Sequence, residues 1–487
     1  EPRPTDHYAE NKITFPADYF QRFFDFLNHY NFTTDESTSS FQQVAIDPEM
    51  LGRIFENLLA EQTEDTGVQA RKAKGAFYTP REIVDYMCRE SLRAYIAGKL
   101  PDDDKKNYIL ELLFDKKEHE FDNRNHRADL VPYKKFIIEA LDQVKVLDPA
   151  CGSGAFPMGI LQRMLTLYER LETRFDVYKT KVSIIQNNLY GIDIEPMAVE
   201  IARLRAWLSV LVDEELNPKA KNMGVEPLPN LDFKFVCANS LIPLEKEDSL
   251  FDDKSIVEDM KNIRDSYFNT QSIKTKAEMK KKFAEVLKKT QSLFKTKKHD
   301  QLNTYRPFDT ENSCAFFDAE FMFGVNDGFD VVIGNPPYIS FYSRQSQLDK
   351  YADELKILRK IYNFTDKKIP GRLNTVMFFI EKALSLSSRG GITSFIVDAN
   401  FVELPYRFIR KYIIENSSIL YFVDKLSVFE NVNSDQVLLS LKKEVPSLRH
   451  SFKFYKNFSD AESLIHSEII QGAVNKNNNY DFLDPSF

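Results

Sequence analysis

The chain has 487 residues, of which 43% are hydrophobic, and it carries a formal net charge of −8 with a pI near 5.6. This length and composition indicate a folded protein with a large core plus appendages. Its four cysteines are scattered without metal-ligand spacing, which favours free thiols in a reducing cytoplasm. No apolar run approaches membrane length and no signal peptide is visible, so neither a metal nor a membrane is expected.

The first 73 residues are predicted to be a helical N-terminal segment or connector. Residues 13–60 are expected to be helical, because 18–30 is rich in aromatic residues and 48–61 has apolar residues at helical spacing. A simple helical cap on a sheet is the alternative interpretation. The segment Gly75-Ala76-Phe77-Tyr78-Thr79-Pro80 follows it and begins the predicted core, residues 74–448.

A strand, a glycine loop and a helix are predicted next. The strand 145–148 ends in the small-residue loop Asp148-Pro149-Ala150-Cys151-Gly152-Ser153-Gly154, and 158–168 has helical apolar spacing. Such a loop lets backbone N–H groups approach a ligand near the positive end of a helix. It is neither a Walker sequence nor G-x-G-x-x-G, which disfavours nucleoside triphosphate and nicotinamide ligands.

Two further strands are predicted to end in polar residues. Residues 189–193 form an apolar run that ends in Asp193, followed by Ile194 and a helix over 197–212. An acid at the end of the second strand of a βαβ unit is where a ribose diol is bound. The strand 233–237 is followed by Ala238-Asn239-Ser240. Together these strand ends predict a nucleoside site along one edge of a sheet.

Residues 244–304 are predicted to form a helical insertion rich in Lys, Asp and Glu. The lysines near the C-terminal end of this segment alternate with apolar residues, which indicates an amphipathic helix with a basic face. Contact with a phosphate backbone is one interpretation of that face. A solvated surface hairpin, balanced by the nearby acids, is the interpretation we prefer.

The run 330–339 is the most informative stretch of the chain. It is a buried strand that ends abruptly in Asn335-Pro336-Pro337-Tyr338. Two prolines hold the turn stiff, so the Asn335 amide and the Pro336 carbonyl form a fixed pair of acceptors beside an aromatic ring. This arrangement suits an exocyclic amine on a planar base.

Taken together, these motifs resemble the gamma class of S-adenosylmethionine-dependent DNA adenine-N6 methyltransferases, and in particular the methyltransferase portion of type IIG restriction–modification enzymes. The resemblance covers about residues 50 to 445. It also includes a helix at 373–384, a turn into a strand at 390–395, and the segment 428–435. It implies a doubly wound, seven-stranded α/β core with a helical N-terminal segment and a helical insertion.

The resemblance also implies residue roles. Cofactor-binding residues would be Thr79, Asp148, Pro149, Ala150, Gly152, Gly154, Asp193, Ile194, Asn239 and Ser240. Asn239 stands where the family commonly has Asp, the residue that meets the amine of the cofactor's adenine. Asn335, Pro336, Pro337 and Tyr338 would form the catalytic turn, with Tyr338 and Phe429 stacking on a base flipped out of double-stranded DNA.

Several alternatives stay open at this stage. The substrate could instead be N4 of cytosine, a protein glutamine or an RNA base amine, and a non-catalytic cofactor-binding module is the third possibility. A net charge of −8 is unusual for a protein that binds DNA without the help of another domain or subunit. We therefore expect residues 449–487 to lead to a target-recognition domain in cis or a specificity subunit, with a nuclease domain possible upstream.

Overall fold

The computed structural model describes residues 22, 31–33, 43–45, 79–116, 120–122, 124–172, 175–211, 230–246, 254–268, 270, 272–289, 296–308, 311–341, 354–365, 373–426, 436–447 and 449–476. The chain divides into two compact units, residues 1–54 and 55–487. In the first unit, strands β1 (Asn31–Thr33) and β2 (Gln43–Ala45) pair in parallel.

The two short strands correct the expectation that residues 13–60 are helical throughout. Phe32, Thr33 and Val44 belong to the aromatic and β-branched residues that favour strands, whereas the helical spacing was found only in the flanking stretches. Apart from Arg22, which is helical, those stretches lie outside the described residues.

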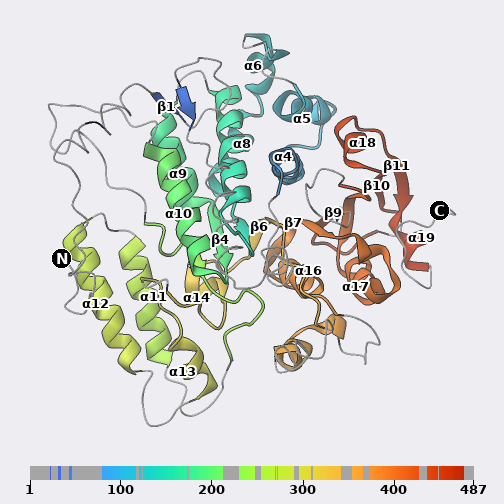
Figure 1. Cartoon of the computed structure of the whole chain (residues 1–487). Helices are drawn as coiled ribbons and strands as arrows, with labels where there is room; N and C mark the ends of the chain where they lie inside the picture. Colours follow the sequence, from blue (N-terminus) through green and yellow to red (C-terminus); the bar gives the residue numbers. More distant parts are fainter. Residues whose placement is uncertain are drawn as a thin grey trace. The chain divides into compact units, whose positions relative to one another are not determined.

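The second unit is built on one nine-stranded sheet in the order β11-β10-β8-β9-β7-β6-β3-β4-β5 (Figure 1). The strands are β3 (Val146–Asp148), β4 (Leu189–Asp193), β5 (Phe235–Cys237), β6 (Phe329–Gly334), β7 (Ser387–Asp398), β8 (Ser418–Val423), β9 (Gln436–Lys442), β10 (Ser451–Tyr455) and β11 (Ser467–Ile470). The five strands from β7 to β5 in this order run parallel to one another, whereas β9 runs antiparallel to both β7 and β8.

Helices cover both faces of this sheet. They are α4 (Arg81–Ala97), α5 (Lys106–Phe114), α6 (Asn125–Leu130), α7 (Lys134–Gln143), α8 (Ala155–Leu171), α9 (Val177–Asn187), α10 (Pro196–Leu211), α11 (Lys254–Phe268), α12 (Ile273–Lys289), α13 (Lys297–Leu302), α14 (Ala319–Phe323), α16 (Thr375–Leu386), α17 (Arg407–Asn416), α18 (Phe458–Glu462) and α19 (Gln471–Lys476). Three short 3-10 helices are η4 (Asn363–Thr365), η5 (Ala399–Val402) and η6 (Leu404–Tyr406).

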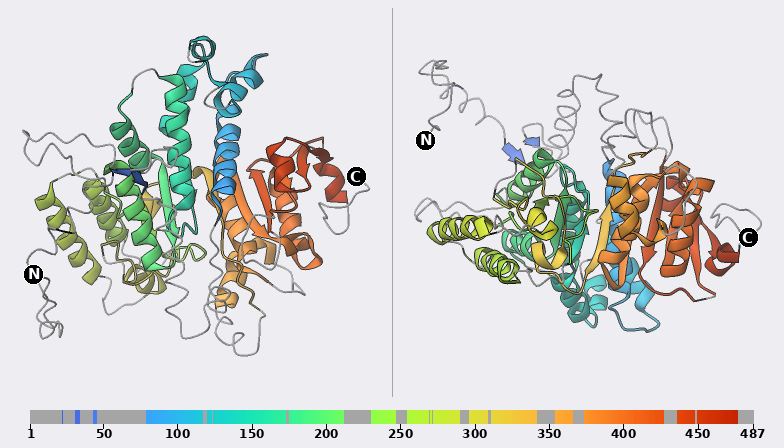
Figure 2. Two further views of the ribbon diagram at one scale, coloured as in Figure 1. Left: turned by 45° about the horizontal axis from the view of Figure 1, so that its top comes forward. Right: turned by 90° about the horizontal axis from the view of Figure 1, so that it is seen from below.

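Successive side chains along the strands point to opposite faces of the sheet and belong to two separate hydrophobic cores. Leu147 and Val332 pack with α14, α16 and α17 on one face, whereas Val146, Val331 and Ile333 pack with α4, α8 and α10 on the other. Figure 2 shows α8, α9 and α10 side by side. Because near-continuous apolar strands of this kind are buried on both sides, the predicted doubly wound α/β fold is confirmed.

Two details differ from the sequence prediction. The sheet has nine strands and not seven, because Phe452 and Tyr455 are buried and β10 pairs in parallel with β8. The predicted turn at 390–395 is a bulge inside β7. There Gly390 has φ +78°, and a side chain on Gly391 would lie 2.8 Å from the Phe329 carbonyl oxygen.

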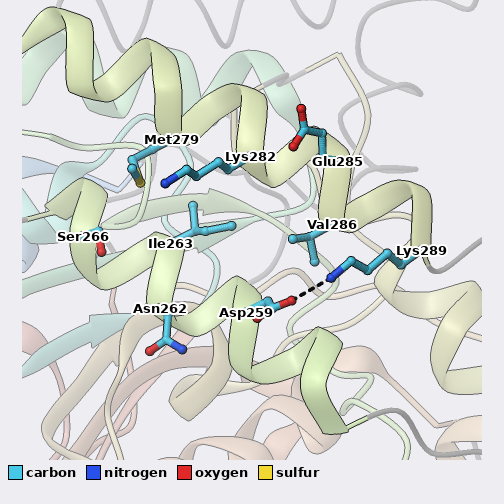
Figure 3. A pocket seen from close by; sticks show the side chains of 9 residues that line it. All are labelled: Asp259, Asn262, Ile263, Ser266, Met279, Lys282, Glu285, Val286 and Lys289. Carbon is cyan, nitrogen blue, oxygen red and sulfur yellow. Dashed lines mark hydrogen bonds and ion pairs between the residues drawn. The ribbon is translucent and has the colours of Figure 1, made fainter.

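The insertion is helical, as predicted. Helices α11 and α12 pack against each other, and a shallow groove between them carries an ion pair of 2.9 Å between Lys289 Nζ and Asp259 Oδ2 (Figure 3). In every view α12 and β11 lie at opposite ends of the second unit (Figures 1 and 2). Within the described ranges, no helix is long and apolar enough to cross a membrane.

Candidate active site

The predicted site residues gather at the carboxyl edge of four neighbouring parallel strands. In the order β6-β3-β4-β5, the residue at or just after each strand end is Asn335, Asp148, Asp193 and Asn239. In an open α/β sheet, ligands bind in the crevice at this edge. The structure therefore brings together residues that are up to 187 positions apart in the chain.

The glycine loop connects β3 to α8. Gly152 has φ +51° and Gly154 has φ +86°, values that favour glycine. A Cβ on Gly154 would lie 3.1 Å from the Cβ of Ala202 in α10, whereas a Cβ on Gly152 would meet no atom within 4 Å. One glycine thus packs closely against a helix, and the other leaves open space beside the N-terminus of α8.

Asp193 fixes this loop from the neighbouring strand. Its carboxylate accepts hydrogen bonds from the backbone N–H of Gly152 and of Glu195, each at 2.8 Å. Burial raises the pKa of Asp193, and these backbone hydrogen bonds oppose that rise. The next residue, Ile194, keeps 60% of its surface exposed, so it presents an apolar side chain at this edge of the sheet.

Asp148 is the most deeply buried acid of the site. Its Oδ1 accepts from the backbone N–H of Ala150 at 3.1 Å, and its Oδ2 has no hydrogen-bond partner among the described residues. Burial raises the pKa of this carboxyl well above its usual value. A Cβ on Gly334 would lie 2.6 Å from Oδ1, so this glycine makes room for the acid.

Two hydrogen bonds to carbonyl oxygens of the loop support it, one of them from a residue that was not predicted. Arg205, buried in α10, donates through Nη1 to the Ser153 carbonyl oxygen at 2.9 Å. The hydroxyl of Ser240 donates to the Pro149 carbonyl oxygen at 2.5 Å, which connects the loop to the end of β5. Arg205 was not predicted, because no local motif distinguishes it from other helical arginines.

The side chain of Asn239 is held by the turn that follows β5. Its Oδ1 accepts from the backbone N–H of Leu241 at 3.0 Å. Its backbone N–H donates to the Cys314 carbonyl oxygen at 2.8 Å. The Oδ1 and the backbone N–H of Asn239 therefore both have hydrogen-bond partners within the protein.

A chain of three side chains occupies the end of β6. The Tyr338 hydroxyl donates to Asn335 Oδ1 at 2.5 Å, and Asn335 Nδ2 donates to the Thr79 hydroxyl oxygen at 3.2 Å. Burial raises the pKa of Tyr338 well above its usual value. Three predicted site residues, separated by up to 259 positions, therefore meet in one hydrogen-bonded array.

Helix α16 holds the proline turn in place. The hydroxyl oxygen of Thr375 accepts from the Ile339 N–H at 2.9 Å, and the hydroxyl itself donates to the Pro337 carbonyl oxygen. The Thr375 N–H donates to the Ile339 carbonyl oxygen at 3.0 Å. Thr375 was also missed from the sequence, since a threonine at a helix start ordinarily indicates only the helix boundary.

One predicted site residue cannot be placed. Phe429 and the whole segment 428–435 lie outside the described residues. Among the residues that are described, no group of three or more His, Cys, Asp or Glu side chains is arranged to hold a metal ion.

Comparison with known proteins points to a single family. Residues 187–429 match the family model described as the Eco57I restriction-modification methylase. The chain is 24% identical over 446 residues to the type II restriction enzyme and methyltransferase RM.Eco57I of Escherichia coli, covering 86% of this chain and 33% of that protein. It is 34% identical over 225 residues to a Methanocaldococcus jannaschii protein bearing the name type II restriction enzyme and methyltransferase RM.MjaORFECS2P, covering 45% of this chain and 18% of that protein.

The DrdV–DNA complex superposes with a TM-score of 0.43 at 14% identity, covering 85% of this chain and 30% of that one. The chain thus spans a third or less of the length of these relatives.

Proposed function

Because the chain belongs to the Eco57I restriction-modification methylase family, we propose that it transfers a methyl group from S-adenosylmethionine to N6 of adenine in DNA. The observation that carries this proposal is the array of Thr79, Asn335 and Tyr338 next to the glycine loop. It joins a rigid pair of acceptors to a crevice suited to a nucleoside.

The residues of the crevice fit the cofactor. The open space at Gly152 and the N-terminus of α8 allow a polar ligand to approach backbone N–H groups. Asp193 stands where a ribose diol would be bound, and the exposed Ile194 offers an apolar surface for an adenine ring. When bound, S-adenosylmethionine supplies its methyl group as an electrophile on a sulfonium.

The catalytic work of the protein lies in orienting the target amine. The lone pair of an exocyclic adenine amine is conjugated with the ring and is a poor nucleophile. Asn335 Oδ1 accepts from Tyr338 and retains a second lone pair, and the Pro336 carbonyl is the other acceptor. Two acceptors on the amine hydrogens favour a pyramidal nitrogen whose lone pair is free. Positioning of the amine and electrostatic stabilisation therefore account for the acceleration of methyl transfer, and no strong base is required.

The base must leave the duplex to reach this edge. We propose that Tyr338 stacks on the flipped adenine, with Phe429 on its other face. Duplex DNA is the proposed substrate. A target-recognition region in cis or a specificity subunit is the proposed source of sequence selection, and a nuclease domain upstream is a further proposed partner.

Methyl transfer to oligonucleotides tests the proposal. The protein is incubated with isotopically labelled S-adenosylmethionine and DNA, and the digested product is analysed by mass spectrometry. We expect N6-methyladenine, and we expect Asn335→Ala to abolish its formation nearly completely while cofactor affinity stays largely intact. Formation of N4-methylcytosine would contradict the adenine assignment. A variant with collapsed cofactor affinity but a normal rate at saturation would make Asn335 a cofactor residue.

A further inference from the structure

The charges of the insertion 244–304 are separated along the chain. Eight of its eleven acids precede residue 266, whereas ten of its thirteen lysines follow residue 273. Helix α12 alone carries seven lysines and two glutamates, a formal charge of +5 in a chain whose net charge is −8. Six of these seven lysines are exposed. The helix therefore presents a concentrated positive charge that the composition of the whole chain does not reveal.

Three of the exposed lysines, Lys274, Lys281 and Lys288, form a lysine row along α12. They are seven positions apart, or nearly two helical turns, so they share one face of the helix at intervals of about 10 Å. The apolar side chains of α12 are buried on its opposite side. Among the described residues, none of these three lysines is in an ion pair. Lys289, which faces α11, is by contrast paired with Asp259 at 2.9 Å (Figure 3).

Helix α12 runs toward the edge of the sheet that carries the site. Its neighbour α11 ends beside the amino end of β5, where the Tyr267 hydroxyl donates to Asp232 Oδ2 at 2.8 Å. The two helices are antiparallel. Lys276 Nζ, at the start of α12, lies 5.9 Å from the centre of the Tyr267 ring, and the ion pair of Lys289 joins the end of α12 to the first half of α11. The C-terminal end of the lysine row therefore lies on the carboxyl side of the sheet.

Helix α13, which follows α12 in the chain, lies at the carboxyl edge itself. Gln301 Nε2 donates to the Pro243 carbonyl oxygen at 3.0 Å, and Gln301 Oε1 accepts from the Glu245 N–H at 2.8 Å. Both partners come shortly after the end of β5. The first residue of α13, Lys297, is exposed. The positive surface thus continues from α12 to the edge at which Asn335 lies.

The separation of this surface from the catalytic turn matches the dimensions of a DNA duplex. Strand β5 is the last strand of the sheet and lies three strands from β6, and α12 lies at the same end of the second unit (Figures 1 and 2). Three strand spacings and two helix packing distances amount to roughly 30–35 Å. One turn of B-form DNA is about 34–36 Å long. A duplex that lies along this edge and delivers one base to Asn335 therefore extends to α12.

We propose that the lysine row of α12, continued by Lys297, binds the phosphate backbone of duplex DNA about one helical turn from the target adenine. The inference rests on the proposed function, DNA methylation. Lysines neutralise phosphates whatever the base sequence, so this surface positions the duplex and does not read it. The proposal replaces the solvated surface hairpin that the sequence favoured, because most acids of the insertion precede the helix that carries the row.

Fluorescence anisotropy with a labelled duplex of about three helical turns, at several salt concentrations, tests this inference. Each phosphate contact contributes about 0.9 to the slope of log affinity against log salt. Combining Lys274→Gln, Lys281→Gln and Lys288→Gln should reduce that slope by about two to three and weaken binding at least tenfold near 0.1 M salt. The matched control replaces three exposed lysines near the end of α4 and the starts of α5 and α7, and should weaken binding less than threefold. These control changes are Lys99→Gln, Lys105→Gln and Lys135→Gln.

Removing acids from the same helix should have the opposite effect. Glu278 and Glu285 are exposed on α12 beside the lysine row, so each would repel a phosphate bound there. Combining Glu278→Gln with Glu285→Gln should strengthen duplex binding about threefold or more near 0.1 M salt, where charges further than about 10 Å apart are largely screened. Melting curves verify that every variant is folded.

The possible outcomes separate the two levels of the argument. Equal salt slopes in the α12 lysine variant and the unmodified protein would overturn the role of α12 and leave the proposed methylation standing. If the unmodified protein bound no duplex even at low salt, this inference would be overturned. Failure of the same protein to transfer a methyl group to DNA would overturn the proposed function as well.

Discussion

Asp148 should make the ligand-free protein less stable than a neutral residue would. Its carboxyl is 1% exposed, and its Oδ2 has no hydrogen-bond partner among the described residues. We therefore predict that Asp148→Asn, which keeps an oxygen for the Ala150 N–H, raises the melting temperature of the ligand-free protein at pH 7. The same change should weaken binding of S-adenosylmethionine, because the family resemblance implies that Asp148 is one of the residues that hold the cofactor.

The magnitude follows from burial and from the pKa. The amide nitrogen that Asp148→Asn introduces would be as unpartnered as Oδ2, so the gain comes from removing the charge: each unit by which the folded-state pKa is raised costs about 1.4 kcal/mol once the group is ionised. We expect Asp148→Asn to gain roughly 1–3 kcal/mol of unfolding free energy, which amounts to a few degrees in melting temperature for a chain of this size. Affinity for S-adenosylmethionine should fall about tenfold or more, since hydrogen bonds to charged groups contribute about 1.5–3 kcal/mol.

The stabilisation should depend on pH in a defined direction. Burial raises the pKa of Asp148 above 3.8, so the folded protein retains a proton at pH values at which the unfolded chain has lost it. The acid therefore destabilises the protein increasingly as the pH rises from 3.8 to its folded-state pKa, and has no such effect below 3.8. The advantage of Asp148→Asn should vanish in acid and should grow with pH until the folded-state pKa of Asp148 is passed.

Asp330→Asn is the matched control. Asp330 lies at the opposite end of β6, where its Oδ2 accepts from the Lys145 N–H at 2.9 Å and its Oδ1 from the Ser388 hydroxyl at 3.4 Å. Replacing it removes a used acceptor, so we expect a lower melting temperature. Thermal melts at several pH values compare the two variants. If Asp148→Asn lowered the melting temperature at pH 7 as Asp330→Asn does, Asp148 would be an ordinary structural acid and the reasoning would be refuted.

Four further predictions follow from the site. Asp193→Ala should weaken S-adenosylmethionine by roughly 1–3 kcal/mol in calorimetry, and unchanged affinity would refute the role of this acid. Gly154→Ala should lower the free energy of unfolding in urea by more than about 1 kcal/mol, because the residue has φ +86° and its Cβ would meet Ala202 at 3.1 Å; a neutral result would mean that α10 moves away. Tyr338→Phe keeps the ring and loses the bond to Asn335, so its methylation rate should fall less than that of Asn335→Ala; an equal loss would show that the hydroxyl matters more than stacking. Duplex DNA should bind weakly, with strong salt dependence and little sequence preference in gel shifts, and tight site-specific binding would place a recognition element within residues 1–487.

The part of the site that the sequence predicted is the part formed by strand ends. Asp148, Asp193, Asn239 and Asn335 each follow a short apolar run, and an apolar run that ends in a polar residue is a local pattern. The sheet then places these ends side by side, because parallel strands joined through helices all finish at one edge. Local pattern and topology together were sufficient for the positions, while the roles of these residues stay proposals.

The part that the sequence did not predict depends on contacts between distant segments. Arg205 and Thr375 lie in helical stretches whose local spacing indicates only a helix. Their importance comes from the particular carbonyl, amide or hydroxyl that each meets, and pairing of that kind is set by tertiary packing. Strands β10 and β11 were missed for a related reason. A short amphipathic segment indicates a strand only weakly by itself, because its strand conformation depends on pairing with a neighbouring strand.

The connection from β5 to β6 has a consequence for how this chain tolerates change in length. It runs from Ala238 to Gly328 and contains α11 to α14, yet β6 still pairs with β3 at the centre of the sheet. The entropy of closing a flexible loop grows only with the logarithm of its length, so a flexible segment inserted here adds about 0.6 kcal/mol for each doubling of the length of the connection. Removal is different, because α11, α12 and α14 bury Met260, Phe283 and Phe321 in the same core as Val236 of β5. An insertion between these helices leaves the edge that carries Asp148 and Asn335 intact. The connection is therefore a place where the protein can acquire new surface without rebuilding its site.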